Sequence, residues 1–110
     1  MVYQRRTNLD AVFGALADPT RREIVRRLVA QPDLPLAELA APFRMTLPAV
    51  SKHVAVLERA RLVRRTRRGR VSYCRVNPER LGEAARWLES YRRFWEHQLD
   101  RLEEYLDKNP

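Results

Sequence analysis

The sequence is poor in the residues that build metal and catalytic centres. Its 110 residues include one cysteine, Cys74, two histidines and three glycines. A single cysteine excludes a disulfide within the chain. Zinc needs four well-placed ligands, at least three of them protein groups, and one cysteine and two histidines do not assemble such a site within a subunit. No glycine-rich loop for phosphate is present. The sequence therefore predicts a protein that is not an enzyme and uses no metal or cofactor.

Long apolar segments are also absent. No run approaches the roughly 20 residues that a membrane span requires, and the first residues lack the apolar segment of a secretory signal. These absences predict a cytoplasmic protein without membrane insertion. A chain of this length is expected to form one domain with a modest core.

Negative charge is scarce in most of the chain. The sequence has 22 Lys and Arg against 14 Asp and Glu, a net charge of +8. Residues 78–110 hold 8 acids and 6 bases, so residues 1–77 carry +10. Between Arg59 and Arg75 there are eight arginines and no acid. A cluster of one sign can be ordinary solvated surface, but one this dense favours a nucleic acid partner.

The segment before this cluster predicts a helix over residues 46–60. Val50, Val54 and Leu57 recur at helical spacing and form one apolar stripe. Thr46 can cap its N-terminus. The opposite face carries small or basic side chains: Pro48, Ser51, Lys52, Ala55 and Arg59. A slim, positively charged helix of this kind suits the major groove of DNA, although a core helix with a solvated face has the same pattern.

Three shorter helices are predicted before it. They begin at Asn8 after a flexible tail of residues 1–7, at Pro19 after the capping residue Asp18, and near Ala37, with residues 31–35 as a loop. The third runs to about Phe43 and is expected to be short or bent because Pro42 lies inside it. A tight turn at Arg44 then joins it to the helix 46–60. This order is that of a helix-turn-helix.

A basic β-hairpin is predicted after the groove helix. Residues 62–67 and 71–76 favour strands, and Gly69 between them supplies a turn residue. We therefore predict a mainly α fold with a small β-hairpin wing (α+β). This winged helix-turn-helix runs helix–helix–helix–helix–strand–strand–helix, in a single domain over residues 8–110. Cys74 is interpreted as a half-buried strand residue, with a redox role as the alternative.

The last predicted helix, about residues 78–107, has an apolar arc too wide for a single seam. One stripe repeats every seven residues through Leu81, Leu88, Trp95 and Leu102, and a second contains Trp87, Phe94 and Tyr105. We expect Asn77 to cap this helix, one stripe to pack on its own domain and the other on a second subunit. The alternative is one helix wrapped by its own domain. A two-fold dimer would present two groove helices to two half-sites.

Several segments together resemble the ArsR/SmtB family of bacterial winged-helix repressors. They are Ala17-Asp18-Pro19-Thr20-Arg21-Arg22, Glu38-Leu39-Ala40, and residues 47–57 followed by Leu62-Val63. The closing segment, residues 87–95, resembles a non-metal-sensing branch that includes small autorepressors. The resemblance implies a homodimer, joined through its first and last helices, that represses its own operon by binding an imperfect palindrome.

The sequence departs from the family pattern at several positions. Metal-sensing members carry a Cys-x-Cys pair where this chain has Pro35 and Ala37, and the last helix has a single histidine, His97. A site shared across a dimer by His97 with Asp100 or Glu104 is the remaining alternative. Arg61 stands where relatives usually have a helix-ending glycine, so a left-handed backbone is expected there.

The predicted DNA-binding residues lie in the turn, on the groove helix and in the wing: Arg44, Thr46, Leu47, Pro48, Ser51, Lys52, His53, Arg65, Arg67, Arg68 and Arg70. The predicted dimer contacts are Leu9, Val12, Phe13, Leu88, Tyr91, Trp95, Leu99, Leu102 and Leu106. His53 is as well placed to brace the helix as to touch DNA.

The expected partners are a double-stranded DNA operator and a second copy of the chain. The sequence leaves open whether a small-molecule or protein effector exists. Two other functions are compatible with it: non-specific or architectural nucleic-acid binding, and a protein-interaction module built on the last helix.

Overall fold

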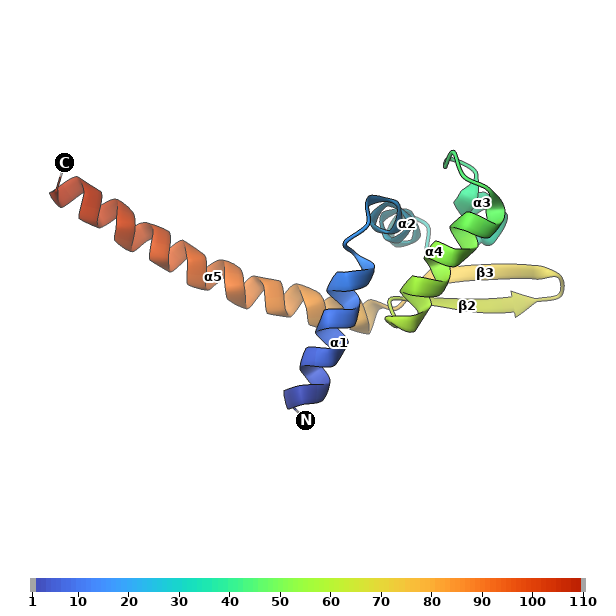
Figure 1. The fold of residues 1–110 in the computed structure, drawn as a ribbon, viewed down its shortest axis with the longest axis horizontal. Helices are drawn as coiled ribbons and strands as arrows, with labels where there is room; N and C mark the ends of the chain where they lie inside the picture. The colour runs from blue at the N-terminus through green and yellow to red at the C-terminus, as the bar shows by residue number, and fades with distance from the viewer. Residues whose placement is uncertain (1, 110) are drawn as a thin grey trace.

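The computed structural model describes residues 2–109, with side chains from Asn8 onward. Within this range the chain forms helices α1 (Val2–Ala15), α2 (Pro19–Ala30), α3 (Leu36–Ala40), α4 (Leu47–Arg59) and α5 (Pro78–Lys108), and strands β1 (Leu34–Pro35), β2 (Val63–Arg68) and β3 (Val71–Val76) (Figure 1). The predicted fold class, mainly helical with a small β wing, is confirmed.

The first helix is longer than predicted. It begins at Val2, so the predicted start at Asn8 is wrong, and residues 2–7 belong to the helix rather than to a separate tail. Those residues include neither proline nor glycine, so nothing in them stops a helix. The preference of Asn8 for a capping position does not outweigh an uninterrupted helix.

The segment of residues 18–22 lies at the junction of α1 and α2 and caps both helices. Asp18 caps α2 as predicted, because Oδ2 accepts from the backbone N–H of Arg21 at 3.0 Å. Arg21 Nε donates to the carbonyl of Ala15 at 2.6 Å, and Arg22 Nη1 donates to that of Leu16 at 2.8 Å. One short segment therefore provides hydrogen-bond partners for a backbone N–H at the start of α2 and for backbone carbonyls at the end of α1.

This capping arrangement predicts a pH dependence. The backbone N–H of Arg21 holds the pKa of the Asp18 carboxyl below its usual value of 3.8. A lowered pKa means that the stabilisation is complete above pH 3.8 and is lost as the pH falls through the folded value. Asp18→Asn keeps a good capping side chain but cannot titrate. We expect the free energy of unfolding to fall less between pH 5 and pH 3 in this variant than in the wild type, as chemical denaturation would measure. Equal losses in both proteins would contradict this role.

One core joins α1–α4 to the base of the hairpin. Ile24, Leu28, Leu39, Leu57 and Leu62 are fully buried in it, and partly buried side chains such as Phe43 pack around them. The core thereby fixes α4 against the rest of the domain.

The sheet has a third strand that the sequence did not predict. In β1, Leu34 pairs with Cys74 and Pro35 with Tyr73, which gives the antiparallel order β1-β3-β2. The prediction of residues 31–35 as a loop is therefore wrong for these two positions. A two-residue strand is too short for periodicity to reveal, and Pro35 is tolerated because β1 is an edge strand.

The hairpin agrees with the prediction to within one residue at each strand. The register pairs Arg68 with Val71, so Gly69 and Arg70 form a two-residue loop. Gly69 has φ +64°, as a turn with glycine at its first central position requires.

Helix α3 is shorter than predicted. It spans Leu36–Ala40 instead of residues 37–43, so Pro42 lies in the turn and not in the helix. Proline lacks the N–H that a continuing helix needs.

Helix α5 projects away from the domain as a long arm (Figure 1). Its 31 residues span about 46 Å at 1.5 Å per residue. The radius of gyration is 18.5 Å, against about 13 Å for a compact chain of this length. Leu81 and Ala84 pack on the core and Trp87 on Phe13, whereas the large apolar side chains beyond Trp87 are exposed. The prediction that one stripe packs on the domain and the other on a second subunit is therefore wrong. Side chains of both stripes contact the domain in the first turns of α5, and side chains of both are exposed farther along, because the small domain covers only those first turns.

Candidate nucleic-acid interface

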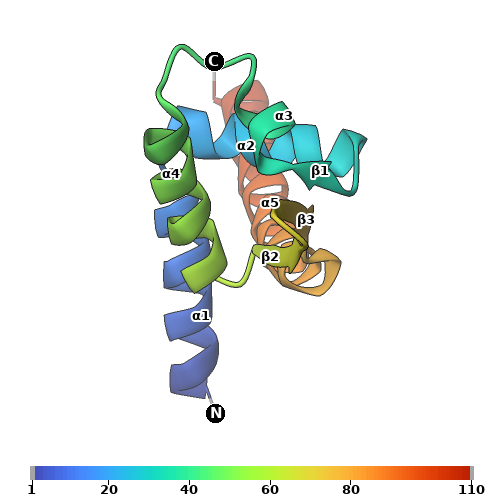
Figure 2. The same cartoon turned by 90° about the vertical axis from the view of Figure 1, so that its right-hand side faces the viewer.

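Helix α4 is held by its back and presents its N-terminal turns outward. The side chains of Val50, Val54 and Leu57 are fully buried. Thr46 caps the helix as predicted, since its Oγ1 accepts from the backbone N–H of Ala49 at 3.2 Å. The opposite face leaves exposed four of the predicted contact residues: Thr46, Leu47, Pro48 and Lys52. Arg44, in the preceding turn, is exposed too. Figure 2 shows α4 running beside the hairpin.

The C-terminal end of α4 is closed by a left-handed arginine. Arg61 has φ +60°, the left-handed conformation that was expected at this helix end. Its N–H donates to the carbonyl of Glu58 at 2.9 Å, and that of Leu62 donates to the carbonyl of Leu57 at 3.0 Å. These two bonds form a Schellman motif.

Asn77 ties this end of α4 to the start of α5. Its Nδ2 donates to the carbonyl of Arg61 at 2.9 Å, and its backbone N–H donates to that of Leu62 at 2.7 Å. The side chain therefore does not cap α5, contrary to the prediction. It links the helix that faces outward to the base of the arm.

The strain at Arg61 gives a testable stability prediction. A side chain in the left-handed region costs about 1 kcal/mol relative to glycine, so Arg61→Gly should raise the free energy of unfolding by about that amount. Arg61→Ala removes the same charge but keeps the Cβ, and should give no such gain. Urea denaturation of both variants measures the difference. A glycine variant no more stable than the alanine variant would contradict the assignment.

His53 faces the domain interior. Its side chain is 22% exposed, and Nδ1 lies 3.4 Å from Arg21 Nη1 and 3.9 Å from Asp18 Oδ2. These contacts support the first of its two predicted roles, bracing α4 against the start of α2, whereas the DNA contact stays a prediction.

Arg65 likewise does not lie on the open surface of the wing. Its side chain is 21% exposed and crosses from β2 to α4, where Nη1 donates to Ser51 Oγ at 2.9 Å and Nη2 to the Ser51 carbonyl at 3.0 Å. Nε lies 3.0 Å from Glu58 Oε1 in an ion pair, without an aligned hydrogen bond. The structure thus joins Arg65 to Ser51, and a DNA contact of its own stays a prediction.

The remaining wing arginines surround the hairpin tip. Arg67, Arg68 and Arg70 are exposed. Arg68 lies over the ring of Tyr73, 3.6 Å from its centroid, and pairs with Asp33 Oδ2 at 2.6 Å. Arg67 Nε donates to the carbonyl of Gly69 at 3.2 Å.

Sequence reasoning missed two arginines of the wing, Arg64 and Arg75. They are exposed cross-strand partners. Strand alternation places them on the face opposite Arg65. Counting in steps of two from the buried Val63 reaches Arg65 and Arg67, so the same count would have placed Arg64 on the opposite face.

The predicted dimer contacts divide into two groups. Val12 is 1% exposed and belongs to the chain's own core, so its prediction as an interface residue is corrected. Leu9 and Phe13 are partly buried. The six residues of α5 remain 49–59% exposed, namely Leu88, Tyr91, Trp95, Leu99, Leu102 and Leu106.

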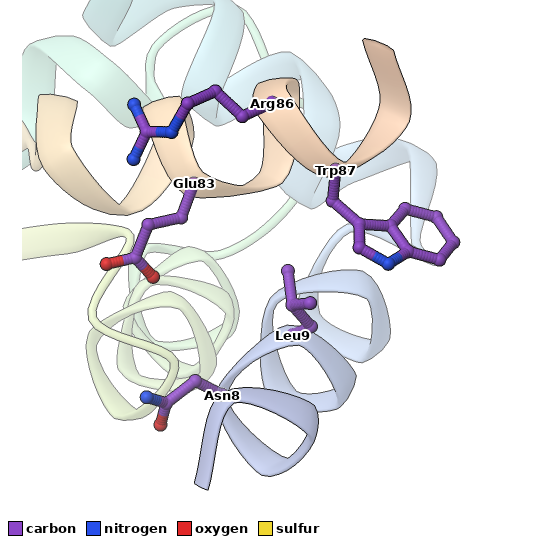
Figure 3. A pocket seen from close by; sticks show the side chains of 5 residues that line it. All are labelled: Asn8, Leu9, Glu83, Arg86 and Trp87. Carbon is purple, nitrogen blue, oxygen red and sulfur yellow. The ribbon is translucent and has the colours of Figure 1, made fainter. Parts of the chain in front are cut away.

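A pocket of about 430 Å³ lies between α1 and α5. Asn8 and Leu9 line it from α1, and Glu83, Arg86 and Trp87 from α5 (Figure 3). It therefore adjoins the exposed apolar face of the arm.

Cys74 is fully buried in the core, rather than half-buried as predicted. Desolvation raises the pKa of its thiol, which disfavours the reactive thiolate. The structure thus gives no support to the alternative of a redox role.

Among residues 2–109, no group of three or more His, Cys, Asp or Glu side chains is arranged to hold a metal ion. In the same range, no helix has the length and apolar character of a membrane span.

The chain has relatives over most of its length. Residues 16–66 match a helix-turn-helix domain. Over 73% of its length it is 30% identical to the transcriptional repressor SdpR of Bacillus subtilis, covering 88% of that protein. Over 89% of its length the chain is 38% identical to an HTH-type transcriptional regulator of Mycobacterium tuberculosis, and the match covers 88% of that protein. A solved ArsR family transcriptional regulator, 37% identical, matches 83% of this chain and 93% of its own with a TM-score of 0.74.

The protein belongs to the ArsR family. It is a transcriptional regulator with a helix-turn-helix DNA-binding domain, as the resemblance in the sequence indicated. These ArsR-family relatives are regulators and not enzymes.

Proposed function

We propose that the protein is a homodimeric repressor that binds a palindromic operator. The observation that carries this proposal is the α5 arm, which exposes nine large apolar side chains: Trp87, Leu88, Tyr91, Phe94, Trp95, Leu99, Leu102, Tyr105 and Leu106. Monomeric proteins rarely expose an apolar surface of this extent. A second copy covers it most simply, since a two-fold axis brings the same surface from both subunits together.

The charge pattern of α5 favours antiparallel pairing of the two arms. Residues 79–93 contain 4 bases and 3 acids, whereas residues 94–109 contain 2 bases and 5 acids. Antiparallel arms would place the acidic half of each beside the basic half of the other, whereas parallel arms would place like halves together.

In such a dimer each subunit offers one α4 helix to the major groove. Leu47, Pro48, Ser51 and Lys52 would face base edges or phosphates there. The arginines at the wing tip would reach flanking phosphates or a narrow minor groove, whose negative potential attracts arginine. Two-fold symmetry of the protein requires an inverted repeat in the operator.

For regulation, we propose that the repressor does not sense a metal. The basis is the ligand set: the chain has one cysteine, which is buried, and two histidines on different helices. If a small-molecule effector exists, we assign it to the α1–α5 pocket, whose volume of about 430 Å³ suits a small ligand, because binding there would alter the packing of the arms. A protein effector is the alternative.

Fluorescence anisotropy on DNA from upstream of the protein's own operon tests this function. We expect a preference over scrambled DNA of about a thousandfold, a steep dependence on salt, and no effect of a chelator. Equal affinity for both DNAs would indicate a non-specific nucleic-acid binder. The absence of salt-dependent binding to either would indicate a protein-interaction module.

A further inference from the structure

Arg65 is held against α4 by contacts with two residues, Ser51 and Glu58. Ser51 Oγ accepts a hydrogen bond from Arg65 Nη1 at 2.9 Å, and the Ser51 carbonyl accepts one from Nη2 at 3.0 Å. The ion pair with Glu58 at 3.0 Å holds the guanidinium from the other side. Three contacts therefore orient one arginine against the outward face of α4.

The chemistry of arginine makes this contact directional. A guanidinium stays protonated and can only donate, whereas a serine hydroxyl can either donate or accept. Because Ser51 Oγ accepts from Arg65, its own proton must point elsewhere. Ser90 Oγ donates to the Trp87 carbonyl within its own helix, but within the described residues Ser51 Oγ donates to no protein acceptor.

We propose that Arg65 is a positioning residue that sets Ser51 as a hydrogen-bond donor toward a DNA base. This inference rests on the proposed operator binding. The major-groove acceptors are N7 and O6 of guanine, N7 of adenine and O4 of thymine, whereas cytosine presents only the N4 donor. The bond from the cationic guanidinium leaves one lone pair on Ser51 Oγ, but it makes that oxygen a weaker acceptor and the hydroxyl proton a stronger donor. The hydroxyl therefore disfavours cytosine at the position it contacts, whereas a hydroxyl without Arg65 would accept from cytosine more readily.

The other role for Arg65 is a direct phosphate contact. The two roles predict different salt dependences. Removing one phosphate contact from each subunit of the proposed dimer lowers the slope of log affinity against log salt by about 1.8. Removing a positioning contact changes base preference and leaves the slope unchanged.

The experiment compares the wild type with Arg65→Met and Ser51→Ala. Each protein selects sites from a library of random double-stranded DNA, and the affinity for every single-base change in the selected site is then measured over a salt series. Ser51→Ala should reduce the preference at one base pair in each half-site by about fivefold, the value of one hydrogen bond. Arg65→Met should raise the relative affinity for cytosine at that same position by about fivefold, with the salt slope and the other preferences kept.

Two further proteins keep the test decisive. Arg65→Lys retains the charge and the aliphatic stem but not the two-pronged contact, and should also relax the discrimination against cytosine; it replaces Arg65→Met if that variant does not fold. In the double variant Ser51→Ala/Arg65→Met, the loss of preference should equal that of Ser51→Ala alone.

The outcomes separate this inference from the proposed function. A wild type that selects no sequence overturns the proposed function. A selective wild type whose Arg65 variants keep the discrimination against cytosine, or whose Arg65→Met variant loses about 1.8 of salt slope instead, overturns only the role of Arg65.

Discussion

Leu99→Glu is expected to convert the protein from dimers to monomers and to weaken operator binding by a hundredfold or more. Leu99 is 59% exposed in the single chain, so the substitution removes little from the fold of the monomer. In the proposed dimer it buries an unpaired carboxylate, which is strongly unfavourable. The loss of affinity follows because two linked half-site contacts gain about 10²–10⁴ over one. Sedimentation equilibrium and anisotropy on the operator measure the two effects.

His97→Glu is the matched control. It introduces a glutamate two positions away, at an exposed residue opposite the apolar arc by helical geometry, and should leave both dimerisation and binding intact. Circular dichroism checks that both variants keep their helices. If Leu99→Glu remains dimeric and binds with wild-type affinity, the arm does not form the interface.

Replacing Arg67, Arg68 and Arg70 with glutamine should reduce the slope of log affinity against log salt by about 5, because the proposed dimer carries two wings and loses the three arginines from each. Each arginine that leaves a phosphate lowers the slope by about 0.9. The affinity for specific and scrambled DNA should fall together, since phosphate contacts carry little sequence information. Arg68 also contacts Asp33 and Tyr73. A guanidinium has five donors and this side chain is exposed, so these contacts leave donors free for a phosphate.

The control replaces three exposed bases outside the wing with glutamine: Arg26 on α2, and Arg101 and Lys108 in the acidic half of α5. It changes the net charge by the same amount outside the proposed DNA surface, and its salt slope should match that of the wild type. Equal loss of slope in both triple variants would mean that overall charge, rather than the wing, governs binding.

The sequence predicted the backbone of the DNA-binding unit well because its signals are local. Thr46 and Asp18 act as caps, Gly69 takes a positive φ, and Arg61 adopts the left-handed conformation that its place at a helix end requires. Each of these backbone features depends on a few residues that are adjacent in the sequence.

The destinations of long side chains could not be predicted in this way. Arg65 and His53 lie on candidate contact elements, yet each turns to another element of the domain. Val12 shares the apolar stripe of α1 with Phe13 but lies in the core. β1 exists only because β3 lies beside it. Such contacts join residues far apart in the chain, and no local pattern encodes them.

Hydroxyl-radical footprinting of the wild-type protein on its selected operator tests the central claim most directly. A two-fold dimer with one α4 helix per half-site predicts two protected segments related by symmetry, with centres about 10 base pairs or a multiple of that apart. A single protected segment, or uniform protection at every site on the DNA, would contradict the account.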